Sequence, residues 1–321
     1  MPKFAIITSF LGQTKDRFHD YNAPLSLEEK YRMASQIEDM SGVECVYPYE
    51  ISDPALTKAL AAKYGLSFAA VNVNVKAEPA FRDGGLTSPD KAVRDRAVAF
   101  IKEAKDFAEK IGAPRVTCCP LSDGYEFCFQ TDYALAWKRL IETFGEAASY
   151  KPNVPLYIEY KPSETRGICF LNNTPKTLLL ISQIGLPALG VTFDFGHAMY
   201  GTPNPAEELV LLAESGRPYY VHINDNDGRW DWDYFCGTKH LLEYAEFLFY
   251  LRKYKYDDFL TSDTSPTRWD IKGTFAANNR ITRKLWDLLD RMEQKDFAKM
   301  IGARDYLTTW KFIEENLYGL K

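Results

Sequence analysis

The run PLYIEYKP at residues 155–162 decides the fold class, because it combines a buried strand with charged residues at its end. Leu156 and Ile158 alternate with Glu159 and Lys161, and residues two apart in a strand point to the same side. Glu159 and Lys161 therefore share one face. A buried charge costs several kcal/mol unless it is paired or binds a metal. The pair is either a simple ion pair that closes a sheet or part of a functional site.

Seven other runs rich in β-branched or aromatic residues recur along the chain, and segments with helical periodicity separate them. The eight predicted strands cover residues 4–10, 42–49, 68–75, 115–121, 155–162, 190–198, 219–225 and 258–266. The predicted helices lie near residues 26–40, 54–64, 89–111, 132–149, 174–184, 205–215 and 238–254. This alternation indicates βαβ units around a parallel sheet.

The fold class predicted from this pattern is α/β, as a (β/α)8 TIM barrel with a C-terminal helical extension. An open doubly wound sheet is the alternative. It is disfavoured because no glycine-rich phosphate loop follows the first strand, and because polar residues end many strands instead of meeting at one switch point. Residues 1–270 are predicted to form the catalytic barrel domain, and residues 271–321 the extension.

The predicted extension carries aromatic residues at helical spacing, among them Trp286, Phe297 and Trp310. An apolar helical tail must bury itself on the barrel or on a neighbouring subunit. We therefore expect a homo-oligomer, either a dimer or a tetramer.

The composition narrows the class of protein. Hydrophobic residues make up 46% of the chain and charged residues 26%, which supports a large core. A net charge of -5 without a basic run argues against nucleic-acid binding. No apolar window is long enough for a membrane span, and no signal peptide is recognised, so a cytoplasmic location is expected. Six cysteines without a CxxC pair are interpreted as buried thiols.

Acid and imidazole side chains stand at the ends of the last four predicted strands. Glu159 ends the fifth strand, Asp194 and His197 the sixth, His222 the seventh and Asp263 the eighth. Each alone has an ordinary structural explanation, such as a turn or an acid that orients an imidazole. Together they indicate one site, because a barrel's active site forms from neighbouring strand ends. Carboxylates and imidazoles without a thiolate suit Mn, Co or Mg, and also permit Zn.

The loop after the seventh strand adds a second acidic group. Asp231 and Asp233 alternate with Trp230 and Trp232, and crowded carboxylates repel one another unless they face water or a cation. We predict that these acids belong to the site. The predicted contacts to a substrate are Phe10, Asn72, Arg166, His197, Trp230 and Trp232, although packing is the commoner role of aromatic residues.

This ordered set resembles the xylose isomerase-like TIM-barrel superfamily, which includes xylose and rhamnose isomerases, ketose 3-epimerases and endonuclease IV repair enzymes. The stretch EYKPSETR at residues 159–166 is similar to the EYKP region of rhamnose isomerase. The resemblance implies a first metal held by Glu159, Asp194, His222 and Asp263. It also implies a second metal position near His197, Asp231 and Asp233.

The resemblance further implies a metal-dependent aldose–ketose isomerase that acts on a free monosaccharide by hydride shift, with Lys161, Glu159 and Asp263 as catalytic residues. A ketose 3-epimerase is the alternative. Such enzymes use one metal and two glutamates, and Asp263 stands where the second glutamate is expected. A metal-dependent dehydratase or lyase and a non-catalytic sugar-binding protein are weaker alternatives. Endonuclease IV is disfavoured, because its extra zinc histidines are missing after residues 68–75 and 115–121.

Overall fold

A computed structural model describes residues 2–202 and 204–320 of the chain. Eight strands, all paired in parallel, close into a barrel in the order β1-β12-β11-β10-β8-β6-β5-β4. They are β1 (Lys3–Ile7), β4 (Met40–Tyr47), β5 (Ser67–Val73), β6 (Val116–Cys118), β8 (Leu156–Glu159), β10 (Leu189–Asp194), β11 (Tyr219–Ile223) and β12 (Phe259–Ser262). The predicted (β/α)8 TIM barrel is confirmed.

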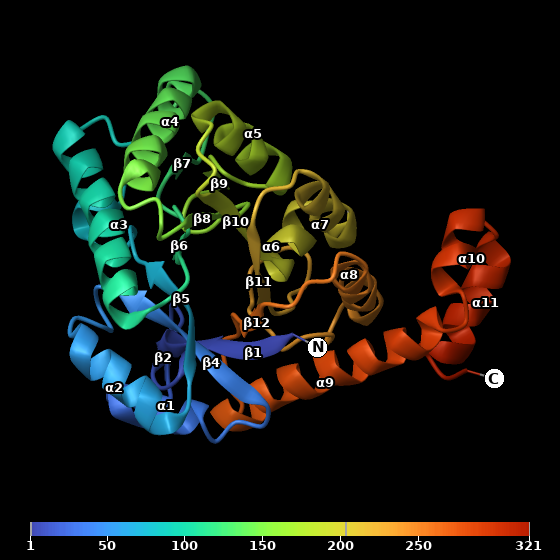
Figure 1. Ribbon diagram of the computed structural model, residues 1–321. Coiled ribbons are helices and arrows are strands. Elements are labelled where there is room, and N and C mark those ends of the chain that lie inside the picture. The colour runs from blue at the N-terminus through green and yellow to red at the C-terminus, as the bar shows by residue number, and fades with distance from the viewer. Residues whose placement is uncertain (1, 203, 321) are drawn as a thin grey trace.

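Helices surround the barrel (Figure 1). The long ones are α1 (Leu27–Ala34), α2 (Pro54–Tyr64), α3 (Lys91–Ile111), α4 (Tyr133–Ser149), α5 (Thr174–Ile184), α7 (Pro205–Glu214), α8 (Leu241–Lys253) and α9 (Ile271–Glu293). Three short helical turns follow strands β1, β5 and β10, namely η1 (Thr8–Phe10), η2 (Pro79–Phe81) and α6 (Phe195–Gly201). Side-chain caps fix several helix starts. At α1, for example, Ser26 and Glu29 form a reciprocal capping box.

Several details differ from the sequence prediction. The strands predicted over residues 4–10, 115–121, 155–162 and 258–266 end early, at Ile7, Cys118, Glu159 and Ser262. The helix predicted over residues 26–40 ends at Ala34. Tighter turns follow it at Gln36 and Ile37, and Asp39, with a φ of 62°, then leads the chain into β4. The strand predicted over residues 190–198 ends at Asp194, whose side chain caps α6. Five of the six cysteines are buried as expected. Cys128 is exposed, because it lies in the loop between β7 and α4.

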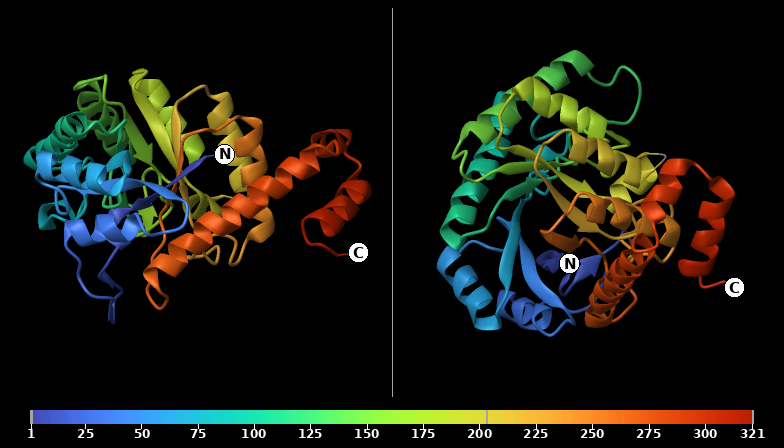
Figure 2. Two further views of the ribbon diagram at one scale, coloured as in Figure 1. Left: turned by 60° about the horizontal axis from the view of Figure 1, so that its bottom comes forward. Right: turned by 45° about the vertical axis from the view of Figure 1, so that its right-hand side comes forward.

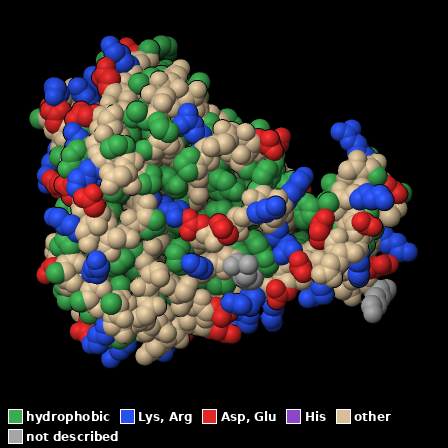
Figure 3. Space-filling model, in the orientation of Figure 1, with side chains coloured by type: hydrophobic (Ala, Val, Ile, Leu, Met, Phe, Trp, Pro, Cys, Tyr) green, Lys and Arg blue, Asp and Glu red, His purple; other side chains and the backbone are tan. Residues whose placement is uncertain are grey.

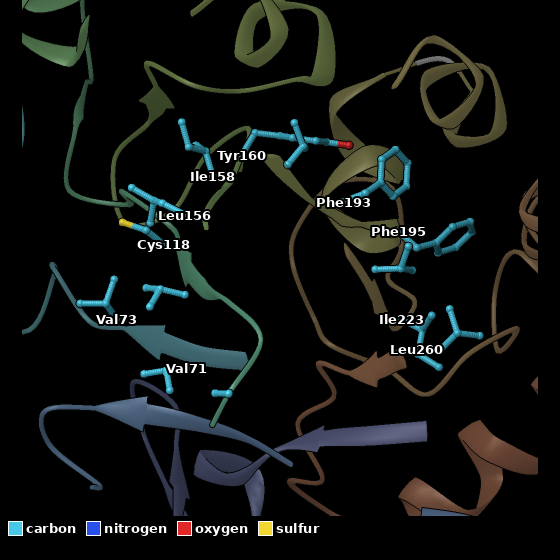
Figure 4. Close-up of a cluster of buried hydrophobic side chains, with 14 of the residues drawn as sticks. Val71, Val73, Cys118, Leu156, Ile158, Tyr160, Phe193, Phe195, Ile223 and Leu260 are labelled. Atoms are coloured by element: carbon cyan, nitrogen blue, oxygen red, sulfur yellow. The ribbon is translucent and has the colours of Figure 1, made fainter. Parts of the chain in front are cut away.

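Alternation along β8 separates two environments. Leu156, Ile158 and Tyr160 belong to the core between the barrel and its helices (Figure 4). Aromatic side chains of other strands extend this core, as where Phe193 of β10 stacks on Phe247 of α8 with ring centroids 5.4 Å apart. The alternate residues of β8 point into the barrel.

The N-terminal end of the barrel interior is filled by large aromatic residues beside glycines. A Cβ at Gly42 would lie 2.5 Å from Phe259, and one at Gly190 would lie 2.6 Å from Tyr157. Arg115 lies against the rings of Tyr157 and Tyr220, 5.3 and 4.7 Å from their centroids, and pairs with Asp258. This end of the barrel is therefore packed shut.

Two small antiparallel strand pairs organise loops at the opposite end. β2 (Thr14–Lys15) pairs with β3 (Asp20–Tyr21), and β7 (Gly124–Tyr125) pairs with β9 (Ile168–Cys169). The second pair connects the loop after β6 to the loop after β8. It thereby braces the segment that follows Lys161.

The C-terminal segment forms an arm. α9 lies beside α8. α10 (Phe297–Ala303) and α11 (Tyr306–Asn316) follow the C-terminal end of α9 and stand outside the barrel (Figures 1 and 2). Phe297 packs on Phe249 of α8 at 5.5 Å. Hydrophobic side chains are visible between the arm and the barrel (Figure 3). Across residues 2–202 and 204–320, every helix is too short or too polar for a membrane span.

Candidate metal centre

Four side chains converge at the C-terminal end of the barrel. Glu159, Asp194, His222 and Asp263 each offer a ligand atom, and these atoms lie within 4.8 Å of one another. Parallel register explains the convergence, because Asp194 pairs directly with His222 across β10 and β11. Oxygen and nitrogen ligands at this spacing suit a divalent cation.

The hydrogen bonding of His222 shows that a cation fits. Its Nδ1 has no hydrogen-bond partner among the described residues. That atom lies 3.3 Å from a Glu159 oxygen, 3.5 Å from an Asp263 oxygen and 3.9 Å from an Asp194 oxygen. A buried nitrogen lone pair among three carboxylates is unfavourable unless a proton or a metal ion lies between them.

Asp194 lies at the bottom of this cluster and is fully buried. It accepts hydrogen bonds from the backbone N–H of His197 and from the side-chain amide of Asn224. Burial raises the pKa of Asp194 from 3.8 to about 6, although the charge of His197 acts in the opposite direction. Without a cation, this carboxyl takes up a proton at mildly acidic pH.

A second group lies beside the cluster and includes Lys161. The Lys161 ammonium lies 2.7 Å from Asp231 Oδ2 and 2.7 Å from Glu164 Oε2. His197 Nε2 lies 3.1 Å from the same Asp231 oxygen. Burial lowers the pKa of His197, but Asp194 and Asp231 outweigh this effect and raise it to about 9.

Asp233 completes this second group. Burial, together with the charges of Asp231 and Asp263, raises the pKa of Asp233 well above its usual range. One oxygen each of Asp231 and Asp233, and Nδ1 of His197, lack a hydrogen-bond partner within the described ranges. These atoms are available to a substrate hydroxyl or a cation.

A cavity of about 210 Å³ opens above the cluster. Its volume is below the roughly 300–1,000 Å³ typical of drug-sized ligand sites, so it suits one small molecule. Apolar residues form one part of its lining, namely Ile7, Phe10, Val46, Cys119 and Leu121. Polar residues form the remainder, namely Ser9, Asn72, Asn74, Lys76, Glu159, Lys161, His197, Asp231, Asp233 and Asp263.

The predicted substrate contacts fall into two groups. Phe10, Asn72 and His197 line the cavity, whereas Trp230, Trp232 and Arg166 do not. The two tryptophans are exposed on the rim, because alternation in their loop turns Asp231 and Asp233 inward. The Arg166 side chain instead pairs with Glu126 and donates to the Ser122 carbonyl. The roles of these residues in substrate binding stay predictions.

The sequence prediction missed two buried polar partners of the centre. Glu44 contacts His222, and Asn224 donates to both oxygens of Asp194. Asn224 follows His222 by two residues in a strand, so its inward direction could have been inferred. Glu44 lies within the run GVECVY, where an acid inside an apolar strand was the available signal.

Fold and site together define a TIM barrel with a potential metal centre at its catalytic end. The profile of the xylose isomerase-like TIM barrel family matches residues 33–290. The chain therefore belongs to this family.

Individual relatives share a low fraction of identical residues with this chain. The chain is similar to the xylose isomerase of Thermus thermophilus, with 26% identity over 183 residues, which is 55% of this chain and 47% of the relative. It thus spans about half the length of that relative. The solved structure of an L-ribulose 3-epimerase superposes with a TM-score of 0.73 at 18% identity, covering 95% of this chain and 99% of the other. A 3-keto-D-glucoside 4-epimerase from E. coli gives 0.70 at 16% identity, covering 88% and 100%.

We expect metal affinity to fall as the pH drops. Burial lowers the pKa of His222, but Glu44 and Glu159 outweigh this and raise it well above its usual range, so a cation must displace its proton, and below about pH 6 that of Asp194 as well. A cation binds the carboxylate form, so each unit below that pH costs roughly tenfold in apparent affinity for this one proton. Calorimetric titration with Mn²⁺ at pH 5 to 7, in buffers of different ionisation enthalpy, measures both the affinity and the released protons. Affinity that stays constant over this range would contradict the expectation.

Proposed function

We propose that this chain is a divalent-metal-dependent aldose–ketose isomerase that acts on a free monosaccharide. The observation that carries the proposal is the Lys161 ammonium, which lines the cavity beside the four-residue cluster and is held by Asp231 and Glu164. Family membership and the sugar-converting enzymes among its structural neighbours support the sugar substrate. Mn, Co and Mg are the ions that best suit the ligands, and Zn is permitted.

When bound at Glu159, Asp194, His222 and Asp263, the ion would stabilise negative charge that develops on substrate oxygens. Lys161 adds a fixed positive charge at the cavity wall, and its two carboxylate partners hold the ammonium in place. His197, Asp231 and Asp233 offer polar atoms to the sugar hydroxyls or to a second ion.

The apolar part of the lining supports a hydride shift. Ile7, Phe10, Val46 and Leu121 exclude water from part of the cavity. A hydride that passes directly from C2 to C1 needs no base at the C–H bond and benefits from such a dry wall. The proton of the C2 hydroxyl must still pass to the C1 oxygen, and the unpartnered oxygens of Asp231 and Asp233 could carry it. A proton-transfer mechanism, in contrast, requires a carboxylate with open access to the C–H bond.

A ketose 3-epimerase is the second candidate, and one observation favours it. The Lys161 ammonium and His197 both lie against Asp231 Oδ2, so this oxygen is already paired and a second ion would have to compete for it. A single ion with Glu159 as a base would resemble the arrangement of 3-epimerases. Against this, the second acid at the cluster is Asp263, whose side chain is shorter than glutamate.

The experiment that separates these functions follows deuterium placed on C2 of the substrate. For the isomerase, we expect the label to remain in the product, because the hydrogen moves as a hydride within the molecule. A panel of free pentoses, hexoses and deoxyhexoses with added Mn²⁺ provides the substrates. Loss of the label to solvent would support proton transfer. The matching ketoses, which carry no hydrogen on C2, are tested unlabelled, and their conversion to C3 epimers without aldose would replace the isomerase by the epimerase.

The arm supports a further part of the proposal, namely a homo-oligomer. No residue of α11 is buried, and Tyr306, Leu307 and Trp310 are exposed on it. An apolar surface of this kind is often covered by a partner. A dimer or tetramer and a cytoplasmic location stay predictions, and light scattering of the purified chain tests the assembly.

A further inference from the structure

Glu44 is a buried carboxylate beneath the metal centre that has no role in the functions considered so far. It lies on β4 and is 0% exposed. Its Oε2 lies 3.0 Å from His222 Nε2 and 2.9 Å from the Tyr220 hydroxyl, and its Oε1 accepts from the Asn72 side-chain amide at 2.8 Å. Three side chains from two strands, β5 and β11, therefore meet on one carboxylate of β4.

The chemistry of these contacts determines the state of His222. Glu44 already accepts hydrogen bonds from the Tyr220 hydroxyl and the Asn72 amide, so it serves as the acceptor of this group and Nε2 of His222 is the nitrogen placed to donate to it. In the neutral imidazole, Nδ1 then has a free lone pair. This is the atom that faces Glu159 and Asp263 at 3.3 and 3.5 Å.

We infer that Glu44 is a positioning residue for the metal centre, which fixes the tautomer and the ring orientation of His222. Histidine ligands commonly donate their second nitrogen to a carboxylate, which raises their basicity toward the metal. The inference rests on the metal site of the proposed function, but not on the identity of the sugar or of the reaction.

Asn72 extends this arrangement to the cavity. Its amide nitrogen is used by Glu44, and its carbonyl oxygen accepts no hydrogen bond from the part of the chain that the structure describes. Because Asn72 lines the cavity, that oxygen is available to a substrate hydroxyl. Glu44 thus orients a metal ligand on one side and a cavity residue on the other.

Metal binding without any sugar tests the inference. The metal-free protein and its Glu44→Leu and Glu44→Gln variants are titrated with Mn²⁺ in a calorimeter. We expect Glu44→Leu to weaken binding by about 10–100-fold, as is usual when such a partner of a histidine ligand is lost. Glu44→Gln should weaken it less, because its amide oxygen can still accept from Nε2.

Glu208→Gln is the matched control. Glu208 is a buried carboxylate on α7 that accepts from the Thr174 backbone and does not contact the cluster. Its replacement should lower the melting temperature and leave Mn²⁺ affinity unchanged. A loss of affinity in this variant equal to that of Glu44→Gln would overturn the inference, because it would reflect general destabilisation.

The hydrogen bond from His222 Nε2–H to Glu44 gives a second readout. The chain has only four histidines, so NMR of the Zn²⁺-loaded protein resolves their ring N–H groups. We expect the Nε2–H of His222 to exchange slowly with water in the wild type and faster in Glu44→Gln, whose amide oxygen is a weaker acceptor, even if Glu44→Leu does not fold. Mn²⁺ affinity within about twofold of wild type, with unchanged exchange of this N–H, would overturn the role of Glu44. Absence of Mn²⁺ binding by the wild type would instead overturn the metal site and the proposed function.

Discussion

Lys161→Met is expected to lower sugar isomerisation by roughly 10²–10³-fold, the usual loss when one preorganised charge-stabilising group is removed. The Lys161 ammonium lies in the cavity wall, and methionine keeps most of its volume without its charge. His197 remains 3.1 Å from Asp231 and still partners that carboxylate, so the chain should stay folded. Steady-state turnover and thermal melting measured on the same preparation check both expectations.

Lys30→Met provides the comparison for this variant. Lys30 pairs with Glu50, and their side chains are only 15% and 11% exposed, but neither lines the cavity. This substitution should lower the melting temperature while turnover stays near wild type. If Lys161→Met behaves in the same way, with stability lost and turnover kept, Lys161 is only a structural ion pair and the isomerase proposal loses its main support.

Chelation of divalent ions is expected to abolish turnover and to lower the melting temperature. Four side chains, three of them acidic, converge within 4.8 Å, and a cation that relieves their repulsion stabilises only the folded chain. At one hundred times its dissociation constant, a bound ion contributes about 2.7 kcal/mol to the free energy of unfolding. Added Mn²⁺, Co²⁺ or Mg²⁺ should restore both activity and melting temperature.

Two variants sharpen the metal experiment. Asp263→Asn removes one charge from the cluster and should weaken the response to Mn²⁺. Asp227→Asn alters an acid of the loop after β11 that caps the backbone of Arg229 and Trp230, and its response should match wild type. Turnover that survives complete chelation would show that the reaction needs no metal.

The barrel could be predicted from the sequence because its strands alternate with helices and end in polar residues. The lengths of the strands could not be predicted, because a strand ends where a side chain accepts a hydrogen bond from the backbone N–H that would otherwise continue the pairing. Asp194 illustrates this, since its cap on His197 ends β10 and begins α6. The turn at Asp39 likewise depends on a left-handed backbone that no glycine signals.

Much of the site could also be predicted, because residues at the ends of neighbouring parallel strands must meet. Glu159, Asp194, His222 and Asp263 come together for this reason. Contacts made by loop residues depend on where each side chain points, and the spacing of residues in the sequence does not give that direction. Trp230 and Trp232 were predicted at the substrate but lie exposed on the rim, and Arg166 is engaged by Glu126. The contact of Glu44 with His222 could not be predicted, because β4 and β11 are not neighbours in the barrel and their side chains meet only across its interior.

Arg115 packs against Tyr157 and Tyr220 and helps to close the N-terminal end of the barrel, so among the described residues the cavity opens at the C-terminal end. Asp194 and His222 do not line the cavity, whereas Glu159 and Asp263 do, so the cluster forms the floor of a cup. In the proposed function, Glu159, Asp194, His222 and Asp263 would hold the cation at that floor, and the sugar would fill the space above it. The ion would then have to bind before the sugar, and a bound sugar would slow exchange of the ion until the product leaves.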